Sequence, residues 1–181
     1  VLEIHSDGAV SVVGDTWAHE LVNNPDGTGN KETHPYDLMQ GPTGDVLIVD
    51  AAANTLLSLD PSTGEISTLA VFDAMPGVFP NPWRNNEPMA DPVPTGIAHG
   101  PDGSVLVSLL SGAPFIPGSA KIVSVKDGAV SDYATGLTMA VDRDYGDFIQ
   151  RMSARFPHEA KGIQAFYDTC WQVFRCLDAM P

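Results

Sequence analysis

Four polar residues stand at the starts of expected β-strands in this 181-residue chain. His34, Tyr36 and Asp37 lie in the segment HPYD, and Thr95 occupies the matching position of a second repeat. An imidazole, a phenol, a carboxylate and a hydroxyl at the mouth of a central channel could bind a small ligand through hydrogen bonds. Alternatively, these groups satisfy backbone donors between repeats. We prefer this second interpretation because buried polar groups usually serve that purpose. They are the candidate ligand-binding residues.

No other pattern points to catalysis or to a metal. The five histidines lack the H-E-x-x-H or H-x-H spacing of a zinc site. Asp26, Thr28 and Asn30 in DGTGN resemble the start of a calcium loop, but the glutamate that closes such a loop is missing. No serine stands in the G-x-S-x-G turn of a hydrolase. We therefore predict a protein that is not an enzyme, with no catalytic, cofactor-binding or metal-binding residue.

Charge and hydropathy exclude two classes of partner. The net charge is -14 and the isoelectric point is about 4.4, whereas nucleic acids and anionic membrane surfaces attract patches of Lys and Arg. No apolar run approaches the roughly 20 residues that span a bilayer. The opening residues VLEIHSDG show no basic or apolar region of a signal peptide. A protein or a small molecule is the expected partner.

The first part of the chain is repetitive. DGAVS at residues 7–11 recurs letter for letter at residues 127–131, and GPTGDVLIV from Gly41 is echoed by GPDGSVLVS from Gly100. A period near 60 residues with several short strands per unit is typical of a propeller or a β-solenoid.

Each repeat predicts four antiparallel strands, separated by turns rich in Gly, Asn and Asp. The expected strands are 37–40, 46–49, 55–59 and 66–71 in one unit, and 96–99, 105–109, 121–125 and 129–134 in the next. Before them, LEIH and AVSVVG match the outer two strands of a unit, and residues 136–142 resemble the inner strand of another. The predicted fold is mainly β, an incomplete β-propeller of about two and a half blades. Open blade edges at both ends predict self-association.

Two long loops, residues 23–37 and 75–96, are so rich in Pro and Gly that we expect no regular structure in them. Loops between blades gather on one face of a propeller, where partners bind. Phe79 and Trp83 in the second loop are expected to clip onto blade edges and not to form an aromatic ligand box.

Composition changes sharply near Asp142. Residues 1–142 carry the whole net charge, while residues 143–181 hold five residues of each sign. Phe148, Met152 and Phe156 follow a helical period in the second part, and Pro157 is expected to start a second helix. The predicted domains are a partial propeller over 1–142 and a two-helix tail over 143–181.

The blocks HPYDL, DAAANTLL and VPTGIA make residues 1–142 resemble the ScyD/ScyE family of β-propellers. This resemblance implies a secreted or periplasmic, non-catalytic scaffold of six blades. No catalytic residue is implied by it.

The block FPHEAKGIQAFYDTCW makes residues 143–181 resemble an internal segment of carotenoid (prolycopene) isomerases and phytoene-desaturase-like flavoproteins. The G-x-G-x-x-G segment that holds the flavin in that family is absent, so the resemblance implies neither a flavin nor isomerase activity. We interpret the chain as a fusion of two unrelated genes. Its predicted function is a binding scaffold that acts through inter-blade loops. The alternatives are a carotenoid isomerase remnant and a calcium-dependent, lactonase-like propeller.

Overall fold

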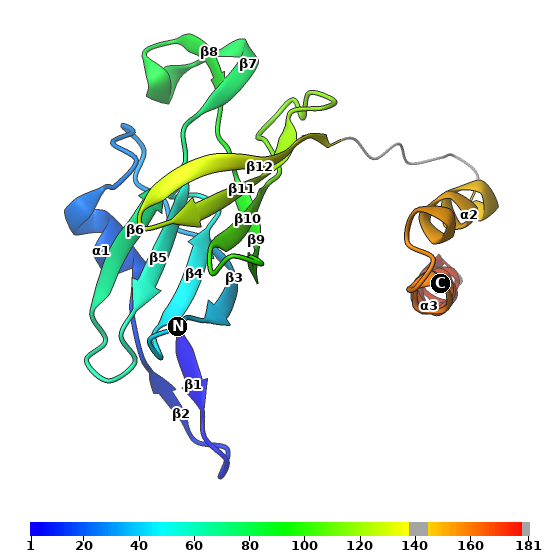
Figure 1. The fold of residues 1–181 in the computed structure, drawn as a ribbon, viewed down its shortest axis with the longest axis horizontal. Helices are drawn as coiled ribbons and strands as arrows, with labels where there is room; N and C mark the ends of the chain where they lie inside the picture. Colours follow the sequence, from blue (N-terminus) through cyan, green and yellow to red (C-terminus); the bar gives the residue numbers. More distant parts are fainter. Residues whose placement is uncertain (138–144, 179–181) are drawn as a thin grey trace. The chain divides into compact units, whose positions relative to one another are not determined.

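The computed structural model describes residues 1–137 and 145–178, which belong to two compact units, Val1–Thr138 and Met139–Pro181 (Figure 1). The boundary predicted at Asp142 lies outside the described residues. Among those residues, no helix combines the length and the hydropathy that a bilayer crossing requires.

The first unit contains two four-stranded antiparallel sheets, as the repeat predicts. Blade 1 is formed by β3 (Pro35–Gln40), β4 (Val46–Asp50), β5 (Thr55–Leu59) and β6 (Ile66–Val71), in that spatial order. Blade 2 is formed by β9 (Pro94–His99), β10 (Val105–Leu109), β11 (Ala120–Lys126) and β12 (Ala129–Leu137). A two-stranded hairpin of β1 (Leu2–Ile4) and β2 (Val10–Val12), here called the half-blade, precedes them. The prediction of a mainly β, incomplete propeller is confirmed.

The largest core lies between blades 1 and 2. Alternate residues of β4, such as Leu47 and Val49, point toward blade 2, where Val107 and Val123 meet them in one buried cluster. This arrangement follows from the two-residue period of strands, which places alternate side chains on opposite faces of a sheet. The two sheets therefore pack face to face as consecutive blades.

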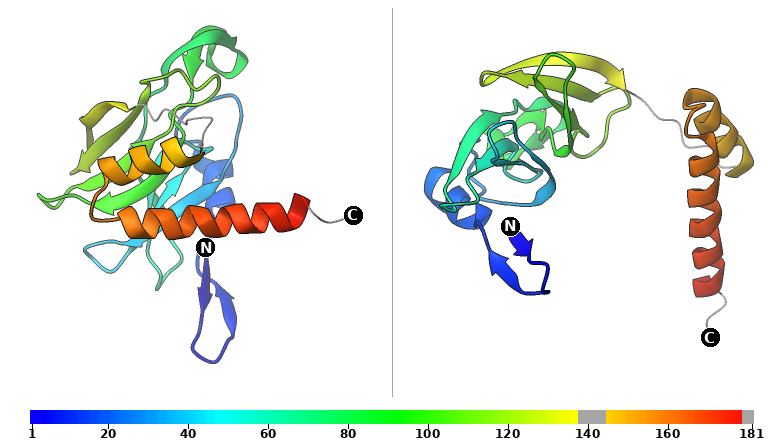
Figure 2. Two further views of the ribbon diagram at one scale, coloured as in Figure 1. Left: turned by 90° about the vertical axis from the view of Figure 1, so that its right-hand side faces the viewer. Right: turned by 60° about the horizontal axis from the view of Figure 1, so that its bottom comes forward.

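The other face of blade 1 carries a second, smaller core. Ile48, Leu57 and Leu59 are buried there, and Val1 and Val13 at the base of the half-blade pack against them. Beyond this base the hairpin extends away from the sheets (Figure 2).

The expectation that residues 75–96 lack regular structure is wrong. They contain β7 (Met75–Asn81), the 3-10 helix η1 (Pro82–Arg84) and β8 (Glu87–Ala90). Prolines are tolerated here because a two-stranded ribbon has free edges that need no N–H donor. Asn85 and Asn86 adopt φ angles of 56° and 60°, a left-handed conformation that asparagine tolerates better than most residues, and so complete the turn.

The first long loop also follows an element that sequence reasoning missed, the helix α1 (Thr16–Asn23). The side chain of Asp15 caps its N-terminus by accepting from the backbone N–H groups of Trp17 and Ala18 at 3.0 and 3.2 Å. An aspartate just before an apolar i, i+4 pair, Trp17 and Leu21, was the available signal.

Residues 136–142 were expected to form the inner strand of a further blade. The part of this segment that the structure describes, Gly136 and Leu137, does not begin a new strand. Gly136 and Leu137 end β12, and Leu137 pairs with Ala120 of β11. Register shifts between strands β11 and β12 let β12 continue past its expected end at Ala134. The remaining residues of the expected strand lie outside the described part.

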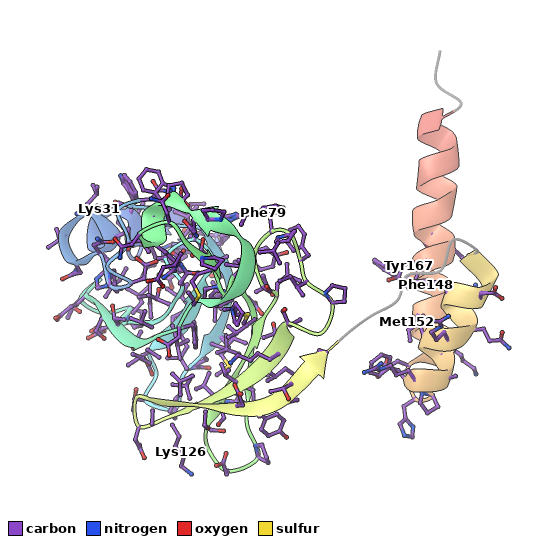
Figure 3. All side chains as sticks on the ribbon, turned by 90° about the horizontal axis from the view of Figure 1, so that it is seen from above. Lys31, Phe79, Lys126, Phe148, Met152 and Tyr167 are labelled. Atoms are coloured by element: carbon purple, nitrogen blue, oxygen red, sulfur yellow. The ribbon has the colours of Figure 1, made fainter. Side chains whose placement is uncertain are left out.

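The second unit contains α2 (Tyr145–Arg155) and α3 (Ala160–Asp178). The rings of Phe148 and Tyr167 meet edge to face between the two helices, with centroids 5.1 Å apart (Figure 3). The second helix does not start at Pro157. The Glu159 N–H donates to the Phe156 carbonyl in a turn, and the first i to i+4 bond of α3 joins Ile163 to Glu159.

Deleting residues 143–181 is expected to leave the stability of the first unit unchanged, within about 0.5 kcal/mol, because the composition step predicts an unrelated passenger. Denaturant unfolding of the full chain carrying Trp171→Phe and of residues 1–142, both followed by the near-ultraviolet signal of Trp17 and Trp83, measures the difference. A fall in the free energy of unfolding of several kcal/mol on deletion would instead identify the tail as a structural cap.

Candidate functional site

The two inter-blade loops come together at one end of the sheets. The chain enters β3 through residues 24–34 and leaves β6 for the β7–β8 ribbon at this same end, which also holds the β4–β5 turn. The end is therefore built from α1, both long loops and the turn between two buried strands. We take it as the candidate site.

Asp50 is the hydrogen-bond centre of this end. It closes β4, and its side chain is fully buried. Its carboxylate accepts from the backbone N–H of His34 at 2.6 Å, from those of Ala52 and Ala53 at 3.2 and 3.1 Å, and from the hydroxyl of Thr33. The loop and the turn are thus fastened to the end of β4 by one carboxylate, as charge-assisted hydrogen bonds allow.

Glu20 of α1 is buried at the same end, with 2% of its surface exposed. No donor meets hydrogen-bonding geometry at either carboxylate oxygen, although the backbone N–H of Glu32 lies close enough to act on the charge. Burial raises the pKa of Glu20, and the nearby charges of Asp26 and Asp50 raise it further, while the Glu32 backbone N–H and the Lys31 charge lower it. The protonated form of Glu20 is therefore favoured by its surroundings.

Glu20→Gln is expected to change how stability depends on pH. The pKa of Glu20 is raised in the folded protein, so the unfolded chain loses this proton first, near the ordinary pKa of 4.5. Stability then falls as the pH rises from there through the raised pKa. Glu20→Gln abolishes this fall, so its free energy of unfolding relative to the natural protein increases with pH. Urea unfolding from pH 4 to pH 8 measures the free energy of unfolding of each protein, with Glu87→Gln, at an exposed position, as the control variant. Parallel pH curves for Glu20→Gln and the natural protein would contradict the assignment.

Asp26 connects the first loop to the rest of the site. Its side chain is 4% exposed and accepts from the Asn54 amide at 2.9 Å and from the Thr28 N–H at 3.0 Å. Arg84 of η1 lies 4.0 Å from Asp26 and donates to Asp91 at 2.7 Å, so one guanidinium spans the two inter-blade loops.

The segment DGTGN, which resembles the start of a calcium loop, makes hydrogen bonds that stabilise the first inter-blade loop. The Thr28 hydroxyl donates to the Asn30 carbonyl, which turns the loop back on itself. Over residues 1–137 and 145–178, no group of three His, Cys, Asp or Glu side chains is arranged to hold a metal ion.

Apolar side chains cover the exposed tip of the second loop. Val78, Phe79 and Trp83 are 56%, 65% and 54% exposed. Trp83 lies against Gly29 of the first loop, where an added Cβ would come within 3.3 Å of the ring. Phe79 stands at the surface of the unit (Figure 3). We call these three residues the loop tip; Trp83 connects the loops, whereas Phe79 faces solvent.

The four predicted ligand-binding residues are placed in two groups. The His34 and Tyr36 rings lie edge to face at 6.0 Å, and Tyr36 and Asp37 line a cavity of about 240 Å³ with Val1, Leu2, Pro35, Leu38 and Ile48. Thr95 does not line this cavity; its hydroxyl lies 3.5 Å from that of Ser108 in blade 2. Asp37 also accepts from the Ile97 N–H at 3.2 Å, a bond between the inner strands of the two blades.

Sequence reasoning missed Asp50, Glu20 and Thr33. An aspartate at the end of a continuous apolar run, followed by a turn of three alanines, was a possible signal of a buried acceptor at a strand end. Glu20 carried no such signal, because its surroundings depend on how residues 24–34 fold back over α1 and on the end of β4.

No family model matches the chain. It is similar to the chloroplastic prolycopene isomerase of Arabidopsis thaliana, with 41% identity over 44 residues, covering 24% of this chain and 7% of that protein. The Daucus carota enzyme of the same name is 37% identical over 46 residues, covering 25% of this chain and 8% of that protein. The chain thus spans less than a tenth of the length of these curated relatives.

Two solved structures are similar at low identity. Virginiamycin B lyase from Staphylococcus aureus has a TM-score of 0.45 with 14% identity, covering 74% of this chain and 33% of that one. The PQQ-bound aldose sugar dehydrogenase of Streptomyces coelicolor has a TM-score of 0.37 with 21% identity, covering 62% of this chain and 30% of that one. The chain spans about a third of the length of each.

Proposed function

We propose that residues 1–142 form a non-enzymatic scaffold of the ScyD/ScyE type that binds a partner through its inter-blade loops. The resemblance of HPYDL, DAAANTLL and VPTGIA motivates the family, and it motivates a secreted or periplasmic location. The observation that carries the binding role is the loop tip. Three neighbouring apolar side chains are more than half exposed at the end of the blades where both long loops meet.

Contacts with the first loop hold the loop tip in place. Arg84 approaches Asp26 and pairs with Asp91, and Trp83 lies on Gly29, so the ribbon that carries Phe79 is held to the first loop. A held apolar surface loses little conformational entropy when a partner binds, which favours affinity. Aromatic side chains are also enriched where proteins bind one another. A protein partner fits this surface.

A photo-crosslinking amino acid at position 79 tests the scaffold role. We expect a discrete adduct in extracts of the natural source, competed by excess unmodified protein and lost when Trp83→Ala is added. The same crosslinker at Ser62, an exposed residue of the β5–β6 turn at the opposite end of blade 1, is the matched control. No competable adduct from position 79, or equal adducts from both positions, would reject the role.

A small ligand beside Tyr36 is a second candidate, favoured by the 240 Å³ cavity that Tyr36 and Asp37 line. A cavity of this size is just below the range typical of small-molecule sites. Ligand-detected NMR with a fragment library, compared between the natural protein and Tyr36→Ala, tests it. Fragments that bind both proteins equally would rule out this cavity.

The remaining alternatives concern cofactors. A calcium-dependent, lactonase-like propeller would show a melting temperature that rises with calcium, since a ligand that binds only the folded state stabilises it. A carotenoid isomerase remnant would carry flavin absorbance after purification. We expect neither signal.

A further inference from the structure

Each paired position of the half-blade has an equivalent position in the outer strands of blade 2, β11 and β12. In the half-blade, Leu2 pairs with Val12 and Ile4 pairs with Val10. In blade 2, Val123 pairs with Asp132 and Val125 pairs with Val130. The recurring DGAVS segment fixes this correspondence, because Ser11 and Ser131 each stand between the two pairs. Leu2 and Ile4 therefore occupy the positions of Val123 and Val125.

These equivalent positions differ in burial. Val123 and Val125 are 2% and 5% exposed because they pack against blade 1, whereas Leu2 and Ile4 are 64% and 76% exposed. Val10 and Val12, which lie opposite them on the same side of the hairpin, are exposed as well. The four residues Leu2, Ile4, Val10 and Val12 are called the hairpin face. It is one half of a blade-to-blade interface.

The other half is present on blade 2. In the repeated segments, Leu106 and Ser108 occupy the positions of Leu47 and Val49, the blade 1 residues that pack toward blade 2. Register places Ala98 opposite Leu106 and Ile122 opposite Ser108, so these side chains share one side of the sheet. Ala98, Leu106, Ser108 and Ile122 are called the outer face of blade 2. The chain thus carries both halves of the same interface at opposite ends of its blades.

We propose that the outer face of blade 2 of one molecule docks on the hairpin face of a second copy of this chain. The contact continues the packing that joins blade 1 to blade 2. It is heterologous, so copies follow one another head to tail until a ring closes. None of these eight side chains is charged, and Lys126, which follows on the same side of β11, is paired with Asp102 at 3.3 Å. The contact therefore brings no like charges directly together, although the chain carries a net charge of -14. Burial of exposed apolar side chains favours the contact.

Sedimentation velocity of the full chain over a hundredfold range of concentration tests the proposal. We expect the average mass of the natural protein to rise with concentration. Ile4→Lys on the hairpin face and Ala98→Lys on the outer face should each remain monomeric. Both positions are exposed, so the substitutions are compatible with folding. Val22→Lys, at an 81% exposed position of α1 outside both faces, should associate like the natural protein.

Mixing the two monomeric variants provides the decisive result. Ile4→Lys retains its outer face and Ala98→Lys retains its hairpin face, so the mixture should form a dimer although neither variant does so alone. A mixture that remains monomeric would overturn the proposal. A natural protein that is monomeric throughout would do the same. Association that survives Ala98→Lys would also overturn it, because it would indicate contact between two hairpin faces or with the tail helices.

Discussion

Asp50→Ala is expected to lower the free energy of unfolding by about 3–5 kcal/mol, because the variant loses the shared acceptor of four hydrogen bonds in a buried network. The fully buried carboxylate holds the backbone N–H groups of His34, Ala52 and Ala53 and the hydroxyl of Thr33. Alanine removes this acceptor, and the N–H of the buried Ala53 then costs about 1–3 kcal/mol as an unsatisfied group, while the other three donors are only partly buried. Guanidinium denaturation followed by circular dichroism measures the change.

The exposed Asp73→Ala is the matched control, because it removes the same charge from the same chain and should change stability by no more than about 0.5 kcal/mol. Comparing the two variants separates the loss of hydrogen bonds from the reduction of net negative charge. If Asp50→Ala were as stable as Asp73→Ala, the loop before β3 would not depend on this carboxylate.

Phe72→Ala is expected to cost about 3–5 kcal/mol, the usual range for a buried phenylalanine. Phe72 follows β6, is 2% exposed, and fills the cluster between the blades with Met75, Leu109 and Val123. Its N–H donates to the Asn54 carbonyl at 2.9 Å, which ties the backbone at Phe72 to the β4–β5 turn. The unfolding midpoint in denaturant should fall without a change in slope, because the same surface is still exposed on unfolding.

Phe79→Ala removes the same ring from the loop tip, where it is 65% exposed, and should change stability by no more than about 0.5 kcal/mol. Equal losses in the two variants would mean that the blades do not pack through Phe72. The pair also bears on function, since only Phe79 belongs to the proposed binding surface.

Local patterning was enough to predict the blades. The expected strands at 55–59, 66–71 and 105–109 coincide with β5, β6 and β10, and the others differ by a few residues at their ends. Strand alternation and turn residues act over short distances, so they can be recognised in the sequence without knowledge of the fold. The repeat then added the order of strands, because equivalent segments adopt equivalent structures.

The candidate ligand-binding residues show where this reasoning stops. Equivalence within the repeat matched Thr95 to the HPYD segment, but Tyr36 borders a cavity and Thr95 contacts Ser108. The side chains differ in size, and the surfaces next to them differ because blade 2 covers one face of blade 1 while the half-blade covers only part of the other. Ligand binding at these positions stays a prediction.

The sequence by itself determined the strand pattern, the number of repeats and the change of composition near Asp142, since each depends on neighbouring residues or on recurrence along the chain. Only the tertiary structure decided which polar groups meet. Glu20, Asp26 and Asp50 come from α1, a loop and a strand end, and Arg84 reaches Asp26 across 58 residues of chain. Their burial and charge interactions depend on distances in space, and a sequence pattern carries no information about those distances until the blades have packed.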